Sequence, residues 1–176
     1  MTVAAIIPPI VVMGVQGSGK TTIGALLAGR LGLPFIDGDS LHSAENRVWM
    51  ASGRPLSDAQ RLPWLHTVGE RLALDPRSGA VVACSALKYR YRQLLRGYVP
   101  TLFTVFARGD IELIHARIAA RAHEFMPSSL LGTQFDDLEE RRDDEPGLTL
   151  DIRLSPERLV ENVLMAINAG RANDEN

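Results

Sequence analysis

The stretch GVQGSGKT, from Gly14 to Thr21, decides how the rest of the chain is interpreted. It fits the pattern G-x-x-x-x-G-K-[ST], follows an apolar run at residues 10–13 and leads into a helical pattern over residues 20–31. Glycines in such a turn let successive backbone N–H groups face an anion, and the start of the helix adds its dipole. The agreement of motif, strand and helix predicts a phosphate-binding loop rather than an ordinary glycine-rich turn.

Two residues of this stretch have specific expected roles in binding a nucleotide. Lys20 is expected to bridge the β- and γ-phosphates, and the hydroxyl of Thr21 to bind Mg²⁺. ATP and Mg²⁺ are therefore the cofactors that the stretch predicts. The predicted nucleotide-binding residues are Gly14, Val15, Gln16, Gly17, Ser18, Gly19, Lys20, Thr21 and Thr22.

Length and composition limit the possible classes of protein. The chain has 176 residues, of which 45% are hydrophobic and 23% charged, which suits one domain (residues 1–176) with its own core. A net charge of −2 and scattered arginines give no basic surface for nucleic acid, and the single cysteine suits a reducing compartment. The apolar N-terminus has no basic leader, and no apolar run approaches the roughly 20 residues of a membrane helix. We expect a cytoplasmic protein that binds neither nucleic acid nor membrane.

Short apolar runs alternate with amphipathic stretches along the chain. Strands are expected at residues 10–13, 34–36, 80–84, 102–106 and 148–152, and helices at 20–31, 40–51, 58–74, 89–96, 110–121 and 157–169. Because the apolar runs are continuous, they favour a parallel sheet buried on both faces. The predicted class is α/β, a three-layer P-loop NTPase fold with a five-stranded parallel sheet flanked by helices. The acidic, arginine-rich segment at about 122–147 is expected to form a mobile lid, or else a solvated helix and loop.

Two absent motifs narrow the class of phosphate-loop protein, and the second also bears on where a metal would be held. There is no N-K-x-D guanine-binding motif, and the strand at 80–84 lacks the terminal aspartate of an ordinary Walker B site. The stretch FIDGDSLH instead offers Asp37 and Asp39 at the end of the second strand. We expect Asp37 to hold the metal and Asp39 to accept the proton of an attacking hydroxyl. The alternative is that these side chains only cap the next helix.

Longer pieces of the sequence resemble a known family. They are MGVQGSGKTT, DGDSLH, NRVWMASGRPLSDAQRLPWL, CSALKYRYRQLLR, ARGD, RIAAR and FMPSSLLGTQFDDLE. In this order and spacing they are similar to the gluconokinases of the thermoresistant, phosphate-loop type, which are related to shikimate and nucleoside-monophosphate kinases. The chain departs from that pattern at Ser43, Trp49, Gln60 and Glu124, which concerns contacts in the acceptor pocket.

The resemblance implies phosphorylation of the 6-hydroxyl of D-gluconate by ATP, giving 6-phosphogluconate and ADP, and it suggests a homodimer. A sugar acid needs cations for its carboxylate, and Lys88, Arg92 and Arg96 follow the third strand at helical spacing. Lys88 is one of only two lysines, and a compact ammonium suits a crowded polyhydroxy ligand better than a guanidinium. A surface lysine is the alternative.

Four further residues have a functional and a structural interpretation. His42 is expected to touch a substrate hydroxyl, or to lie exposed at a helix start. Arg61 is expected to meet the substrate carboxylate, or to pair with Asp58 on its own helix. Gln134 is expected to complete the acceptor pocket, or to pack under the lid. Trp64 is expected in the core, or as the floor of the sugar pocket.

Two arginines lie four residues apart on the helix expected after Asp110. By resemblance, Arg121 is the catalytic arginine beside Lys20 and Asp39, and Arg117 stacks on adenine. Salt bridges to the acidic segment are the alternative. Two other functions stay open at this point: a kinase of another small acceptor, such as shikimate, another sugar acid or a nucleoside monophosphate, and a regulator that binds ATP without turning it over.

Overall fold

The computed structural model of the chain describes residues 7–74, 79–120 and 129–174. Its centre is a sheet of five strands, in the order β2-β3-β1-β4-β5, and all of the pairings are parallel. The strands are β1 (Ile10–Met13), β2 (Phe35–Asp37), β3 (Val81–Ala83), β4 (Phe103–Arg108) and β5 (Gly147–Asp151). This confirms the predicted α/β class and its five-stranded parallel sheet.

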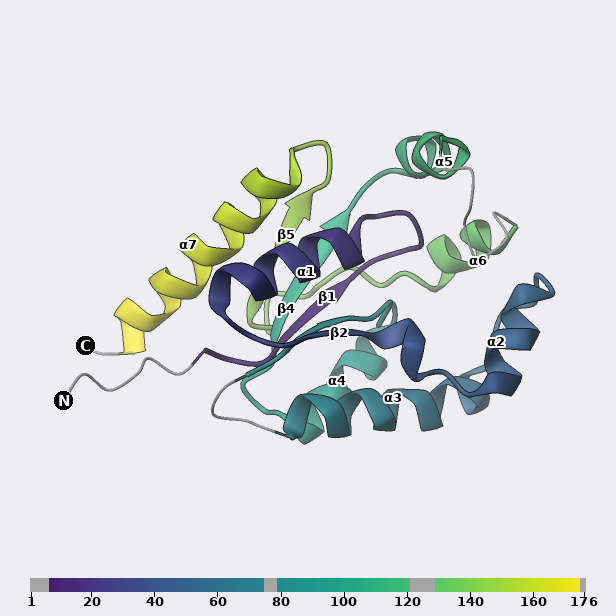
Figure 1. The fold of residues 1–176 in the computed structure, drawn as a ribbon, viewed down its shortest axis with the longest axis horizontal. Helices are drawn as coiled ribbons and strands as arrows, with labels where there is room; N and C mark the ends of the chain where they lie inside the picture. The colour runs from purple at the N-terminus through teal and green to yellow at the C-terminus, as the bar shows by residue number, and fades with distance from the viewer. Residues whose placement is uncertain (1–6, 75–78, 121–128, 175–176) are drawn as a thin grey trace.

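Helices cover both faces of the sheet. Figure 1 shows α1 (Lys20–Leu31) and α7 (Pro156–Asp174) on one face, and α3 (Asp58–Ala73) and α4 (Tyr89–Tyr98) on the other. Strand β1 contributes to both cores: Ile10 and Val12 pack on the side of α1 and α7, whereas Val11 and Met13 pack on the side of α3 and α4. A strand that is buried on both faces has a continuous run of apolar residues, and this pattern is why the strands could be predicted from the sequence.

The remaining elements gather at the end of the sheet toward which the strands point. They are a 3₁₀ turn (Gly38–Leu41), α2 (Ala44–Ala51), α5 (Ile111–Ala119) and α6 (Leu130–Asp137). In Figure 1, α5 and α6 stand beyond the end of β4, and α2 stands beyond α3. Ligands of open α/β sheets bind at this end, so these short elements surround the expected site.

The helix expected at residues 40–51 is wrong in its first turn. Asp37 accepts a hydrogen bond from the amide of Asp39 (3.1 Å) and so caps the 3₁₀ turn instead. Helix α2 begins only at Ala44, after Ser43, whose hydroxyl accepts from the amide of Asn46 (3.1 Å). A serine is a good N-cap, so the α-helix starts directly after Ser43.

Two expected elements, the helix at 110–121 and the lid at 122–147, extend into residues that the structure does not describe. Asp110 caps α5 by accepting from the amide of Leu113 (2.8 Å), and α5 ends at Ala119. Residues 121–128 lie outside the described residues, and they include Arg121 and the first part of the lid. The described part of the expected lid contains a helix, α6, as the alternative of a helix and loop had it, although its bounds were not predicted. Among the helices that the structure describes, none has the length and apolar character needed to cross a bilayer.

Candidate active site

The phosphate-binding loop connects β1 to α1 in the backbone conformation that its glycines allow. Gly17 (φ 76°) and Gly19 (φ 93°) are left-handed, and Gly19 is the N-cap residue of α1. A residue with a Cβ is disfavoured in this conformation. The ammonium of Lys20, in the first turn, donates to the carbonyl of Val15 (3.0 Å), so its side chain folds back over the loop. The loop thus presents the start of α1 together with a cation.

A cavity of about 240 Å³ opens beside this loop. It is lined by eleven of the predicted site residues: Gln16, Gly17, Gly19, Lys20, Thr21, Thr22, Asp37, Asp39, His42, Arg61 and Gln134. Gly14, Val15 and Ser18 belong to the same loop but do not line the cavity, and neither do Lys88, Arg92 and Arg117. Residues from the loop after β1, from the end of β2, and from α1, α3 and α6 therefore meet in one place, as the ends of parallel strands allow.

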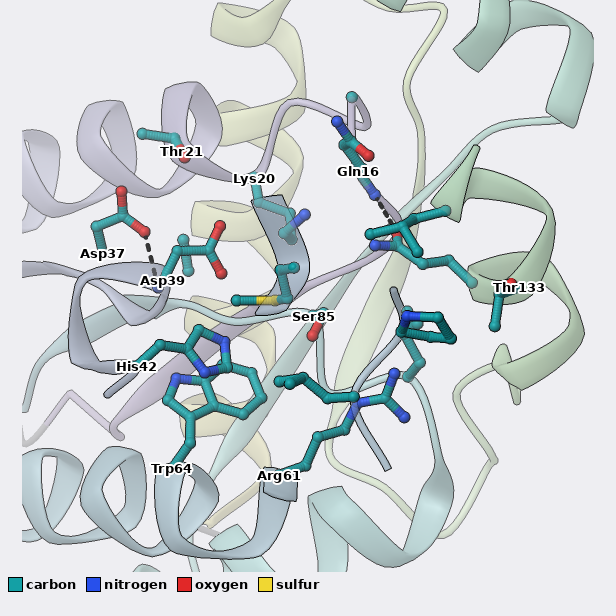
Figure 2. Close-up of a pocket in the computed structure, with 18 of the residues that line it drawn as sticks. Gln16, Lys20, Thr21, Asp37, Asp39, His42, Arg61, Trp64, Ser85 and Thr133 are labelled. Atoms are coloured by element: carbon teal, nitrogen blue, oxygen red, sulfur yellow. Dashed lines mark hydrogen bonds between the residues drawn. The ribbon is translucent and has the colours of Figure 1, made fainter. Parts of the chain in front are cut away.

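The two aspartates after β2 both line the cavity. Their positions depend on Gly38 between them, because a Cβ on Gly38 would collide with the carbonyl oxygen of Ala83 at the end of β3. The carbonyl of Gly38 also accepts a hydrogen bond from the indole N–H of Trp64 (2.7 Å). Figure 2 shows Asp39 between Asp37 and Lys20. Asp37 therefore has the predicted capping role and also lies at the cavity.

His42 lies in the cavity wall as a buried, neutral imidazole. Its ring stacks on the indole of Trp64, with centroids 4.1 Å apart and planes at 16° (Figure 2), and it is only 6% exposed. Burial, and then the positive charges of Arg61 and Arg47, lower the pKa of His42 to about 4. Its Nδ1 has no hydrogen-bond partner among the described residues. The alternative of an exposed histidine at a helix start is wrong, and Trp64 serves both as core and as cavity wall.

Arg61, which lines the cavity, and Lys88, which does not, come from different elements and share one carboxylate partner. Arg61, from α3, donates to the carboxylate of Asp137 (3.0 Å) and to the hydroxyl of Tyr91 (3.2 Å). Lys88, the N-cap residue of α4, pairs with Asp137 (3.1 Å) and Asp58 (3.3 Å). Burial is the largest single influence and lowers the pKa of Lys88, but the hydrogen bonds and charges of Asp137, Asp58 and Tyr91 together outweigh it, so the net pKa is raised. Arg61 thus pairs with Asp137 of α6 and not with Asp58, the alternative partner.

Arg92 is a correction to the predicted substrate-binding set. Its side chain is fully buried, and its guanidinium pairs with the equally buried carboxylate of Glu145 (2.6 and 3.0 Å). The remaining N–H groups donate to the carbonyls of Ala86, Leu87 and Glu140, at 3.1 to 3.2 Å. The guanidinium is thus saturated by protein groups, and it joins the turn after β3 to the segment after α6.

Two of the remaining predicted residues lie where α5 and α6 approach the loop. The guanidinium of Arg117 donates to the carbonyl of Ile152, after β5, and makes no ion pair with the described residues of the acidic segment. The side-chain oxygen of Gln134 accepts a hydrogen bond from the amide of Gln16 (2.6 Å), which ties α6 to the phosphate-binding loop. Arg121 cannot be placed, because it lies outside the described residues.

The chemistry of the donor groups fits a magnesium ion with bound phosphates. Thr21, Asp37 and Asp39 all line the cavity, and Mg²⁺ is usually held by one or two carboxylates, phosphate oxygens and water. Within the described residues, no group of three or more His, Cys, Asp or Glu side chains forms a metal cage. Cys84 is no nucleophile, because burial, and then the charge of Asp39, raise the pKa of its thiol to about 12.

Three residues near the site were missed by the sequence interpretation. Ser85, directly after β3, and Thr133 on α6 line the cavity, and Asp137 holds the two cations. The position of Ser85 at the carboxyl end of a strand was a usable signal. Thr133 and Asp137 lie on α6, whose bounds and tertiary contacts were not predicted from the sequence.

Comparison with known proteins agrees with this geometry. The family model described as shikimate kinase matches residues 16–143. The thermosensitive gluconokinase of Escherichia coli (strain K12) is 42% identical over 93% of this chain and 89% of that protein. The thermoresistant gluconokinase of the same organism is 39% identical over 92% of this chain and 94% of that protein. The crystal structure of a gluconokinase from Sinorhizobium meliloti 1021 is 42% identical, covers 94% of each chain and superposes with a TM-score of 0.87. The chain therefore belongs to the gluconokinase family.

Proposed function

We infer that this protein transfers the γ-phosphoryl group of ATP to the 6-hydroxyl of D-gluconate, giving 6-phosphogluconate and ADP. The observation that carries the inference is one cavity with a phosphate-binding loop at one end and an arginine at the other. Lys20, Asp39 and Arg61 all line it. An anionic, hydroxyl-bearing acceptor matches that order of groups, and the gluconokinase relatives supply the identity of the acceptor.

The transfer step needs a group that takes the proton of the attacking hydroxyl. Asp39 is proposed for this role, because its carboxylate lies in the cavity beside Lys20 (Figure 2). As the 6-oxygen bonds to the γ-phosphorus, the bond from that phosphorus to the β-γ bridging oxygen breaks and ADP leaves. Lys20 and the loop amides stabilise the charge on the phosphates, and Arg121 is proposed to add a second cation. When bound at Thr21 and Asp37, Mg²⁺ supplies further positive charge to the phosphates.

The acceptor is proposed to lie between the loop and the two cations. Arg61 and Lys88 are the proposed partners of its carboxylate. His42 is the proposed partner of a hydroxyl, since the unpartnered Nδ1 of a buried, neutral imidazole accepts or donates one hydrogen bond. Gln134 is proposed to link the acceptor side to the loop through its hydrogen bond with Gln16. Arg117 is proposed to stack on adenine.

The setting of the enzyme is also a proposal. We propose a single kinase domain over residues 1–176, with a lid at about 122–147, that works in the cytoplasm as a homodimer, without nucleic-acid or membrane partners. Light scattering coupled to size exclusion gives the mass directly. A mass of one chain, 19.3 kDa, at working concentration would contradict the dimer.

A coupled assay tests the function. Purified protein is supplied with ATP, Mg²⁺ and D-gluconate, and 6-phosphogluconate is detected through its dehydrogenase. Shikimate, D-glucuronate and a nucleoside monophosphate serve as competing acceptors, scored by ADP release. We expect turnover with D-gluconate well above that with the other three. Equal or greater turnover with any of them would contradict the assignment of the acceptor.

A further inference from the structure

The carboxylate of Asp137 is bound in the way that an acceptor's carboxylate would be. One of its oxygens accepts from the guanidinium of Arg61 (3.0 Å), and the other pairs with the ammonium of Lys88 (3.1 Å). The three side chains are only 16%, 19% and 22% exposed, so solvent screens their interaction less than it would on an open surface. A carboxylate shared between two cations already fills the place proposed for the substrate.

Charge balance makes a second carboxylate at the same place unfavourable. Asp58 and Asp137 together offset the charges of Arg61 and Lys88. An acceptor carboxylate added to this group would meet the charge of Asp137 at close range, and like charges at such distances repel. Of the two aspartates, Asp58 is also held by Arg90 and the hydroxyl of Tyr91, whereas the described contacts of the Asp137 carboxylate are with the two cations alone.

The position of Asp137 at the end of its helix also weakens its hold on the two cations. It is the last residue of α6, where the carbonyl ends of the helix disfavour a negative charge. One turn earlier on the same short helix, Gln134 accepts from the amide of Gln16 in the phosphate-binding loop. Helix α6 is therefore attached near its middle to the phosphate-binding loop, and at its C-terminal end to Arg61 and Lys88.

We propose that Asp137 occupies the carboxylate position of the acceptor site in the free enzyme, and that the carboxylate of the acceptor displaces it from Arg61 and Lys88. This rests on the proposed function, because it assumes an anionic acceptor. Displacement frees the C-terminal end of α6 while Gln134 keeps the middle of the helix on the loop. Asp137 thus sets the specificity of the site: a neutral polyol offers no charge to replace it and leaves the ion pairs in place.

Calorimetric titration of D-gluconate into the complete protein tests the proposal. Asp137→Asn removes the competing charge with almost no change of shape, and Asp136→Asn makes the same change one residue away on the exposed side of α6. If Asp137 holds the cations most of the time, its loss lowers the Kd for D-gluconate by about three- to tenfold. The Kd for ATP, and both Kd values in Asp136→Asn, stay at the wild-type level. A Kd for D-gluconate that is unchanged or raised in Asp137→Asn would overturn the proposal.

Hydrogen exchange separates displacement from a general effect of charge. We expect D-gluconate to speed exchange of the α6 amides in the wild type and not in Asp137→Asn, where the ion pairs are already gone. A lower Kd in the variant without any response of α6 in the wild type would also overturn the proposal. Asp137→Ser gives the same comparison if the asparagine variant does not fold. Because binding is measured without turnover, absence of 6-phosphogluconate from the wild type would count against the proposed function alone.

Discussion

The imidazole of His42 lies flat against the indole of Trp64, 4.1 Å from centroid to centroid, and it is buried without a charge partner. The indole is itself fixed by its hydrogen bond to the carbonyl of Gly38, between the two site aspartates. Burial, and then the guanidinium groups of Arg61 and Arg47, favour the neutral ring. His42 and Trp64 both line the cavity, so the protonation state of His42 is connected to the shape of the cavity wall.

This burial predicts a specific loss of stability in acid. The pKa of His42 is about 4 in the folded protein against a usual value of 6.5, so between these values the unfolded chain binds a proton that the folded chain does not. The contribution of the neutral ring is complete above pH 6.5 and is lost as the pH falls toward 4. At pH 4 the loss is at most about 3 kcal/mol. The free energy of unfolding of wild type and His42→Gln, measured by urea titration at pH 7 and pH 4.5, should differ more at the higher pH. Parallel pH dependences would show that His42 is protonated normally.

The buried pair of Arg92 and Glu145 predicts a large structural effect at a position that had been assigned to substrate. Arg92→Ala leaves a buried carboxylate without its partner, which costs about 3–5 kcal/mol of unfolding free energy. Arg96→Ala, on the same helix, removes an exposed guanidinium with a single hydrogen bond to the carbonyl of Asp144. Its effect should stay within about 0.5 kcal/mol. Urea unfolding of the two variants decides the matter, and similar midpoints would contradict this role for Arg92.

Lys88 predicts a change in acceptor affinity when its size is altered without its charge. Its ammonium fits between Asp58 and Asp137, whereas the bulkier fork of an arginine would have to move one of them. We expect Lys88→Arg to raise the KM for D-gluconate about three- to tenfold, with the KM for ATP unchanged. Steady-state kinetics with each substrate varied in turn measures both constants. A rise in the KM for ATP alone would contradict the proposed contact between Lys88 and the acceptor.

The parts of the structure that could be predicted are those in which neighbouring residues carry the signal. Helix α1 begins and ends at the residues predicted, because the glycine loop precedes it and Gly32 ends it. The capping box of Ser57 and Gln60 at the start of α3 is likewise a local pattern, and it is present in the structure.

The contacts that local patterns did not predict join residues that are distant in the sequence. Arg92 finds Glu145 53 residues away, and helical spacing alone could not reveal that burial. Arg61 finds Asp137 76 residues away, on a helix inside a segment whose acidic composition indicated solvent exposure. His42 was weighed as exposed because its burial depends on Trp64, which comes from a different helix. Tertiary packing, and not local propensity, decides each of these positions.

The most direct test of the account compares Asp39→Asn with Asp37→Asn in the assay for 6-phosphogluconate. Both aspartates line the cavity after β2, and each substitution removes one negative charge. If Asp39 takes the proton of the attacking hydroxyl, its variant loses about 10²- to 10⁴-fold in kcat at every Mg²⁺ concentration. The Asp37 variant should recover activity as Mg²⁺ is raised, because Asp37 is proposed to hold the metal. Wild-type kcat in Asp39→Asn would contradict the assignment of the base.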